Sequence, residues 1–229
     1  MNCLVTAGPT YEPLDQARRL TNFSTGRLGT EWANFLVDQG HEVTLLVGEQ
    51  ATWSASRCAQ HLQVFTTTTD LQQRLERLAG AGIDAVFHAA AVSDFRFGAI
   101  LTRGADGQLR EIRAGKIPTS VEGLIAELKP TLKLIRRLRE WFPNAWLVGW
   151  KYEVDGGRDS VLAAARRQIQ DNATDACVAN GPAYGDGFSL LRSDGTLHHA
   201  AGREALFQIL RSEFTVRARG SNPAGGGQL

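Results

Sequence analysis

The chain has 229 residues, 43% of them hydrophobic, and its 25 basic and 24 acidic side chains leave a formal net charge of +1. This length supports one large hydrophobic core, so we expect a single domain over residues 1–215 and a disordered, Gly- and Pro-containing tail over residues 216–229. The interspersed charges argue against a nucleic-acid partner. No stretch approaches the roughly 20 apolar residues of a membrane span and no signal peptide precedes the first apolar run, so we expect a cytoplasmic protein with no membrane partner.

Short, continuous apolar runs recur along the chain, which is typical of strands buried on both faces of a parallel sheet. They cover residues 3–7, 43–47, 85–91, 145–149 and 175–179. Helical spacing of apolar residues separates them, over residues 32–36, 71–78, 132–141 and 161–169. This alternation predicts an α/β fold, a Rossmann-like doubly wound, mostly parallel sheet with helices on both faces.

The end of the chain departs from this alternation. Residues 188–192 and 196–199 flank a Ser-Asp-Gly turn, which predicts an additional β-hairpin at the sheet edge before a final helix near residues 203–214. The cysteines Cys3, Cys58 and Cys177 are far apart in the sequence and form no CxxC motif, so we expect reduced thiols.

The loop after the first strand is the first candidate binding element, because ligands of open parallel sheets bind beyond the carboxyl ends of the strands. Its length of about fifteen residues is unusual for a connection without function. Ser24-Thr25-Gly26 offers hydroxyls and backbone N–H groups at a helix N-terminus, which favours a phosphorylated ligand. The alternative is that Ser24 or Thr25 only caps the helix. The loop lacks GxGxxG, so no NAD or flavin is expected.

Three later segments also follow predicted strands or an expected hairpin. Small residues at positions 89–91 would let a flat ligand approach the backbone, and Asp94 then offers a carboxylate for a ribose hydroxyl or, alternatively, a helix cap. Lys116 lies in a Gly/Pro loop between an expected hairpin arm and the next helix, where it is either a mobile charge for a ligand or a solvated loop lysine. Trp150 is either a base-stacking surface or a core aromatic, and His88 is expected to be a core histidine.

Together these segments resemble the phosphopantothenoylcysteine synthetase family, the phosphopantothenate-cysteine ligases of coenzyme A biosynthesis. The similar blocks occur in the family's order and extend from residue 2 to about residue 215. They are Thr6-Ala7-Gly8-Pro9-Thr10, Glu12-Pro13-Leu14-Asp15, Asn22-Phe23-Ser24-Thr25-Gly26-Arg27-Leu28-Gly29, Ala89-Ala90-Ala91-Val92-Ser93-Asp94, Gly115-Lys116-Ile117, Val148-Gly149 and Val178-Ala179-Asn180. The flavin-dependent decarboxylase domain of many bacterial relatives is not matched, which implies a free-standing synthetase unless the sequence is part of a longer protein.

The resemblance implies a ligase that activates 4'-phosphopantothenate with CTP or ATP and Mg²⁺, and then joins the acyl group to cysteine. It implies catalytic roles for Lys116, in forming the acyl-nucleotidylate, and for Asn22, in holding it. It implies a homodimer in which a projecting arm of one subunit, assigned to residues 96–113, reaches the other subunit. The implied nucleotide-binding residues are Gly8, Pro9, Thr10, Ser24, Gly26, Ala89, Ala90, Asp94, Trp150 and Arg167. The implied substrate-binding residues are Asn22, Arg27, Ala91 and Asn180.

The sequence departs from the family pattern at several positions, including Trp150, where many members have phenylalanine. Residues 166–172 read Arg-Arg-Gln-Ile-Gln-Asp-Asn, where bacterial members often have a pair of lysines, and Arg167 is a candidate to replace one of them. This departure leaves the choice between CTP and ATP open. It also keeps an alternative function in view, that of a Rossmann-like nucleotide- or flavin-binding protein without synthetase activity.

Overall fold

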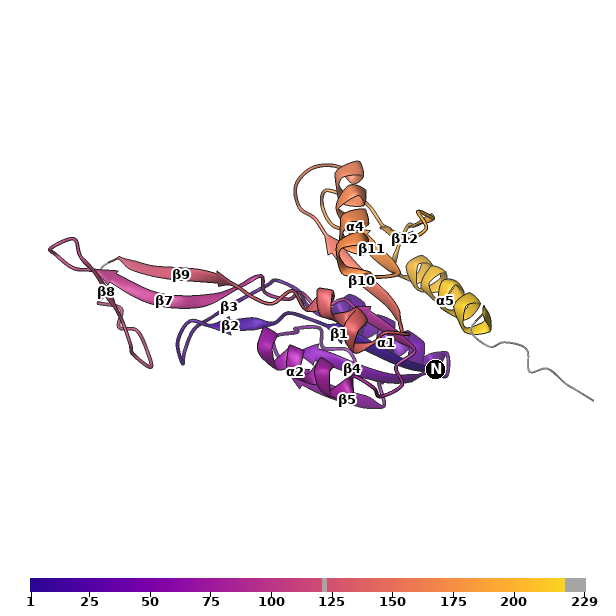
Figure 1. Cartoon of the computed structure of the whole chain (residues 1–229), viewed down its shortest axis with the longest axis horizontal. Helices are drawn as coiled ribbons and strands as arrows, with labels where there is room; N and C mark the ends of the chain where they lie inside the picture. The colour runs from indigo at the N-terminus through magenta and orange to yellow at the C-terminus, as the bar shows by residue number, and fades with distance from the viewer. Residues whose placement is uncertain (121–122, 221–229) are drawn as a thin grey trace, which may run out of the picture.

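The computed structural model describes residues 1–120 and 123–220 and contains a large sheet with helices on both faces (Figure 1). Among these residues the sheet has eight strands, in the order β13-β12-β11-β10-β6-β1-β4-β5. Its parallel strands are β1 (Asn2–Ala7), β4 (Glu42–Gly48), β5 (His61–Phe65), β6 (Ala85–His88), β10 (Trp146–Tyr152) and β11 (Ala176–Asn180). The hairpin of β12 (Phe188–Arg192) and β13 (Leu197–Ala200) adds antiparallel to β11. The predicted Rossmann-like sheet and edge hairpin are confirmed.

Helices cover the sheet because side chains of its central strands are buried on both faces. Along β1, Val5 packs with α1 (Arg27–Asp38) and α5 (Arg203–Gly220) in one core cluster, whereas Leu4 packs in the cluster of α2 (Thr68–Leu78) and α3 (Leu138–Trp141). The remaining helices on that second face are α4 (Arg158–Asn172) and the 3₁₀ helix η1 (Leu134–Arg137). In the part of the chain that is described, no helix is long and apolar enough to cross a bilayer.

Aromatic packing consolidates the α1/α5 face. Phe87 on β6 contacts Trp32 at a centroid distance of 5.0 Å and Trp146 at 5.7 Å, both edge to face. Phe214 of α5 stacks on Trp146 at 5.9 Å. Pairs of this kind add roughly 0.5–1.5 kcal/mol each beyond the area they bury. The strands that carry the site therefore rest on a rigid core.

Three elements differ from the sequence expectations. Strand β5 was not anticipated, because it is an edge strand whose Leu62 and Val64 are exposed, so it shows no continuous apolar run. The helix expected over residues 132–141 is split into η1 and a single turn of α-helix. The last helix continues to Gly220, so residues 216–220 are helical rather than part of a tail, and residues 221–229 lie outside the described residues.

A separate small sheet projects from the body as an arm (Figure 1). Its strands β7 (Phe95–Arg103), β8 (Leu109–Glu111) and β9 (Leu124–Pro130) pair in the order β8-β7-β9. The expected hairpin over residues 96–113 corresponds to β7 and β8, but β9 was not anticipated because every one of its residues is exposed. The loop that carries Lys116 therefore lies inside the arm, between β8 and β9. The strands β2 (Tyr11–Pro13) and β3 (Arg19–Thr21) form a further short hairpin, in the long loop after β1.

Candidate nucleotide and acid cleft

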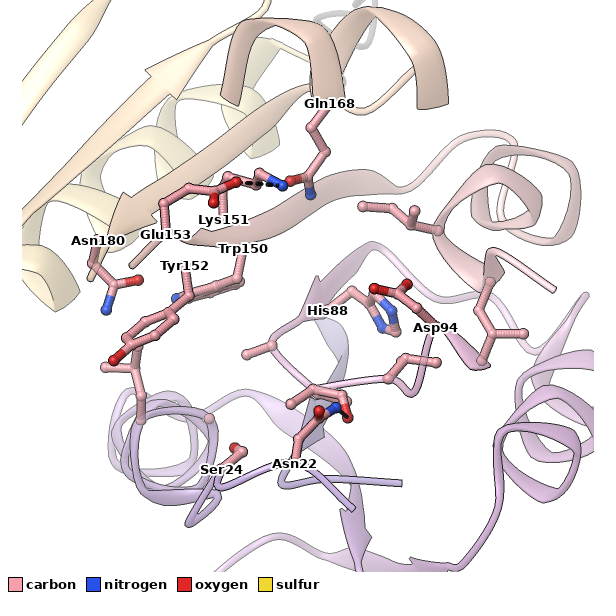
Figure 2. A pocket seen from close by; sticks show the side chains of 18 of the residues that line it. Asn22, Ser24, His88, Asp94, Trp150, Lys151, Tyr152, Glu153, Gln168 and Asn180 are labelled. Atoms are coloured by element: carbon pink, nitrogen blue, oxygen red, sulfur yellow. Dashed lines mark hydrogen bonds and ion pairs between the residues drawn. The ribbon is translucent and has the colours of Figure 1, made fainter. Parts of the chain in front are cut away.

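A cleft of about 1060 Å³ opens at the carboxyl ends of β6, β10 and β11 (Figure 2). This is the expected place for a ligand. From β1 the chain continues to β4 on one side and later returns to β6 on the other side, and ligands of open parallel sheets bind at such a change of direction. Most of the predicted site residues line it, namely Asn22, Ser24, Gly26, Arg27, Ala89, Ala90, Ala91, Asp94, Trp150, Arg167 and Asn180. Gly8, Pro9, Thr10 and Lys116 do not line it.

The N-terminus of α1 forms one wall of the cleft. Gly26 begins the helix with a φ of 76°, and a Cβ there would lie 2.9 Å from the Cβ of Ala51. Gly29 lets the first turn approach β1, because a Cβ at this position would lie 2.7 Å from the Cβ of Ala7. Gly26, at the N-cap, has no side chain to cap the helix, but Thr25 Oγ1 accepts the Arg27 N–H at 3.3 Å. The other N–H groups of the first turn and the helix dipole remain available to an anion, and Ser24 does not act as the cap.

The buried turn from Gly8 to Thr10 lies behind the cleft and holds the loop after β6. Ala91 N–H donates to the Gly8 carbonyl at 3.0 Å, and Thr10 N–H donates back to the Ala91 carbonyl at 3.1 Å. Ser93 N–H donates to Thr10 Oγ1 at 2.8 Å. The turn thus fixes the backbone of residues 89–93 against β1, and its contribution to the site in this structure is to position that loop.

Asn22 and Asp94 approach the cleft from different loops (Figure 2). Asn22 Nδ2 donates to the Ala91 carbonyl at 3.0 Å, which orients the amide, and its Oδ1 has no partner within the described residues. Asp94 is paired with Lys133, whose Nζ lies 2.5 Å from Asp94 Oδ1. The Asp94 carboxylate is therefore charge-compensated, and Oδ2 remains as an acceptor for a ligand hydroxyl.

His88 is a buried histidine at the cleft floor. Its Nδ1 lies 2.9 Å from Thr6 Oγ1, and burial lowers the pKa of its imidazole to about 4. Thr6 Oγ1 also accepts the Ala90 N–H at 3.1 Å. Because the ring is neutral near pH 7, its role is to support the loop after β6, in agreement with the expected core histidine.

The ends of β10 and β11 form the opposite wall (Figure 2). Trp150 is half-buried and presents part of its indole to the cleft. Beside it, Lys151 Nζ pairs with Glu153 Oε1 at 2.8 Å. The backbone carbonyl of Asn180 accepts the Glu153 N–H at 3.1 Å and so holds the ends of the two strands together. Trp150 also packs against the core cluster of the α1/α5 face, so its position fits both the base-stacking role and the core role.

The Lys116 loop is attached to the β2–β3 hairpin. Gln16 N–H donates to the Gly115 carbonyl at 2.9 Å, and Ile117 N–H donates to Asp15 Oδ2 at 3.1 Å. The Arg18 guanidinium, together with the Ile117 N–H, holds the pKa of the Asp15 carboxyl well below its usual value. Lys116 itself is exposed. Within one chain, the structure does not bring Lys116 into the cleft with Asn22 and Asp94.

Several cleft residues were not predicted from the sequence. They are Phe23, Lys133, Arg136, Tyr152, Gln168 and Arg203. Lys133 and Arg136 follow β9. Because β9 was not anticipated, residues 132–141 were expected to form an ordinary amphipathic helix rather than a segment that follows a strand. Gln168 and Tyr152 lie next to the predicted Arg167 and Trp150, so the neighbours of a candidate residue were the available clue. Among the described residues, no group of three or more His, Cys, Asp or Glu is placed to hold a metal ion.

Comparison with known proteins places the chain in a family. The family model of the DNA/pantothenate metabolism flavoprotein C-terminal domain matches residues 1–214. The chain belongs to this family. The coenzyme A biosynthesis bifunctional protein CoaBC of Thermococcus kodakarensis is 36% identical over 177 residues, which are 77% of this chain and 40% of that protein. The CoaBC protein of Mycobacterium tuberculosis is 29% identical over 217 residues, 90% of this chain and 47% of that protein. The chain thus spans less than half the length of these relatives.

Solved structures of the family share the fold. The DNA/pantothenate metabolism flavoprotein from Streptococcus pneumoniae has a TM-score of 0.82 at 26% identity, and the match covers 95% of this chain and 99% of that one. A Cab2 mutant in complex with phosphopantothenate-cysteine has a TM-score of 0.66 at 19% identity, covering 95% of this chain and 88% of that one. The mostly parallel sheet and its antiparallel hairpins are therefore those of the family.

Proposed function

We propose that this chain is a phosphopantothenate-cysteine ligase that activates 4'-phosphopantothenate with CTP or ATP. The observation that carries the proposal is the convergence, in one cleft, of the N-terminus of α1, the oriented amide of Asn22 and the partly buried ring of Trp150. The names of the CoaBC relatives and of the phosphopantothenate-cysteine complex support the same chemistry. We further propose that the reaction takes place in the cytoplasm.

The chemistry needs positioning and charge stabilisation rather than a side-chain nucleophile. A carboxylate oxygen of 4'-phosphopantothenate attacks the α-phosphorus of the nucleotide, the bond from that phosphorus to the bridging oxygen breaks, and pyrophosphate leaves. The amine of cysteine then attacks the acyl carbon, loses a proton, and displaces the nucleoside monophosphate. Both steps bring anionic groups together, so donors that are fixed before the reaction lower the barrier.

The cleft residues divide between the two ligands. We assign the phosphates to Ser24, Gly26 and the first turn of α1, the base to Trp150, and a ribose hydroxyl to Asp94. Asn22, with its amide fixed against Ala91, would hold the acyl-nucleotidylate. The rest of the assignment follows the sequence prediction. It gives the nucleotide Ala89, Ala90 and Arg167, and the acid substrate Arg27, Ala91 and Asn180.

Mg²⁺ would enter with the triphosphate, whose oxygens are ligands that this ion prefers. Of the cleft carboxylates, Asp94 and Glu153 are already paired with lysines, and Asp171 belongs to no group of three or more potential ligands among the described residues. The residues present therefore fit an ion held largely by nucleotide oxygens and water, and the ion would screen the phosphate charge during activation.

The arm supports a homodimer. Cross-strand partners share a face of a sheet, and this register places Phe95, Phe97 and Ile100 of β7 on the same face as Leu124 and Leu128 of β9. The exposed fractions are 47% for Phe95, 40% for Leu124 and 48% for Leu128. A continuous apolar face on a thin projecting sheet marks an interaction surface.

We propose that a second copy of the chain covers this face and that Lys116 of one subunit completes the cleft of the other. Lys116 is exposed on the arm and does not line the cleft of its own chain, so a shared site gives it access to the developing phosphate charge. The dimer would thereby join the two halves of the site.

The test is to incubate the protein with 4'-phosphopantothenate, cysteine, Mg²⁺ and either CTP or ATP, and to measure pyrophosphate release and the amide product. Turnover with one nucleotide supports the ligase and identifies the co-substrate. Nucleotide binding without either product would favour the alternative, a nucleotide-binding protein without synthetase activity.

A further inference from the structure

The mouth of the cleft carries apolar side chains that are open to solvent. Phe23, in the loop before α1, has an exposed fraction of 105%, the highest of any large hydrophobic residue that the structure describes. Tyr152 and Val154, at and just beyond the end of β10, are each 62% exposed. All three line the cleft. Exposed apolar residues that gather around one opening indicate a contact surface, whereas those scattered singly need no explanation.

The backbone on both sides of Phe23 is fixed to the body of the molecule. Before it, Thr21 Oγ1 donates to the Thr10 carbonyl at 2.9 Å. After it, the Trp53 N–H donates to the Thr25 carbonyl at 3.0 Å. Phe23 is therefore exposed on a loop that is held in place. Its ring can move by rotation of the side chain alone, and such rotation is fast for exposed residues.

The opposite side of the opening is built from one face of β10. Side chains two positions apart along a strand share a face, so Tyr152 lies on the same side of β10 as Trp150. Figure 2 shows the Tyr152 side chain extending from the end of the strand toward the wall that carries Ser24. Phe23 directly precedes Ser24 in the sequence and follows Asn22. Phe23 and Tyr152 thus border the opening from opposite walls.

The proposed reaction passes through a compound that water can destroy, and the inference rests on that proposed function. In the acyl-nucleotidylate, the acyl carbon bears a nucleoside monophosphate as its leaving group. Attack by the amine of cysteine gives the amide. Attack by a water oxygen breaks the same bond between the acyl carbon and oxygen, releases the nucleoside monophosphate and a proton, and returns 4'-phosphopantothenate. Exclusion of water from a closed site prevents this kind of side reaction.

We propose that Phe23 and Tyr152 close over the bound acyl-nucleotidylate and thereby favour cysteine over water as the nucleophile. Phe23 follows Asn22, the residue assigned to hold this intermediate, and Tyr152 lies beside the proposed base-stacking Trp150. Cysteine enters while the rings are open and is then enclosed with the intermediate. Closure removes apolar ring surface from water, so it is stabilised by the same side chains that perform it.

The test uses Phe23→Ala and Tyr152→Ala, with Phe23→Leu as the conservative variant and Leu62→Ala as the matched control. Leu62 on β5 is 45% exposed and does not line the cleft. The readout is the amount of pyrophosphate released for each amide formed at low cysteine. The unaltered protein and Leu62→Ala should form the two products in equal amounts. Each alanine variant should hydrolyse the intermediate about tenfold faster, equivalent to about 1.4 kcal/mol in the barrier, and so release excess pyrophosphate. Phe23→Leu should recover part of the coupling.

Reaction in water that carries a heavy oxygen isotope identifies the atom that water attacks. Attack on the acyl carbon places the label in the carboxylate of the recovered 4'-phosphopantothenate. Attack on the α-phosphorus of the nucleotide places it in the nucleoside monophosphate. The proposal predicts labelled carboxylate in both alanine variants, and sedimentation of these variants should match that of the unaltered protein.

The proposal is overturned if the alanine variants form pyrophosphate and amide in equal amounts, or if the label appears in the nucleoside monophosphate. Loss of the dimer in Phe23→Ala, with the two products still equal, would overturn it by assigning this ring to a contact between subunits. An unaltered protein that releases no pyrophosphate and forms no amide would refute the ligase and this inference together. An active ligase whose alanine variants stay coupled would refute only the role of Phe23 and Tyr152.

Discussion

The body of the molecule and its arm carry different parts of one proposed site, and they are built in opposite ways. In the body, the loop after β6 is tied to the Gly8–Thr10 turn by backbone hydrogen bonds, and Asn22 is fixed against it. In the arm, β8 and β9 are exposed throughout and an apolar face lies in solvent. On the proposed function, the body supplies a half-site that is fixed within one chain, and the arm supplies the other half to a second copy of the chain.

The largest effect should come from the arm. Replacing Lys116 by alanine should lower the rate of pyrophosphate release at least about a hundredfold, because a preorganised charge at the reacting phosphate is lost. Lys129→Ala is the matched control, since Lys129 is also an arm lysine but pairs with Glu127 at 3.3 Å. Equal pyrophosphate release in both variants would remove the role of Lys116.

In the body, Asn22→Asp should slow the second step rather than the first. The substitution removes the donor to the Ala91 carbonyl and places a negative charge beside an anionic intermediate, so consumption of the acyl-nucleotidylate should fall about a hundredfold. Rapid-quench measurement should then show the intermediate accumulating. An unchanged ratio of the two rates would contradict the assignment.

The stability of the body and its dependence on pH can be probed through His88. Burial lowers the pKa of its imidazole from 6.5 to about 4, so below pH 6.5 the unfolded chain takes up a proton that the folded chain does not. The free energy of unfolding should therefore fall by about 2 kcal/mol between pH 6.5 and pH 5, and this loss should level off near pH 4. In His88→Asn, urea titrations over the same pH range should show a fall in the free energy of unfolding that is smaller by this amount. An undiminished fall in the variant would assign the pH dependence to other groups.

The proposed dimer contact of the arm can be weakened by placing a charge on its apolar face. Leu128→Glu should weaken dimerisation roughly tenfold, because a carboxylate would be buried at the interface. The control is Ile125→Glu, on the opposite face of the same strand. Sedimentation should separate the two variants while thermal melting of the body stays the same. A Leu128→Glu protein that remains as dimeric as Ile125→Glu would place the interface elsewhere.

The sequence predicted the body better than the arm, and the reason is physical. Buried parallel strands leave continuous apolar runs, so the Rossmann-like sheet and the cleft positions of the Ser24–Gly26 turn, Asp94 and Trp150 could be anticipated. Strand β9 is exposed throughout, and β5 is fully buried only at Phe65, so neither strand leaves such a run. The burial of Thr10 behind the cleft and the pairing of Lys133 with Asp94 depend on contacts between residues 83 and 39 positions apart, which no local pattern encodes.

The central claim, that the site is shared between two subunits, is tested most directly by mixing inactive variants. Lys116→Ala and Asn22→Asp subunits, each inactive alone, are allowed to exchange and amide formation is measured. If Asn22 and Lys116 act from different subunits, one site of each mixed dimer carries both native residues, and about a quarter of the wild-type activity should return. If both residues act from the same chain, every site keeps one defect, and the absence of any recovery would contradict the account.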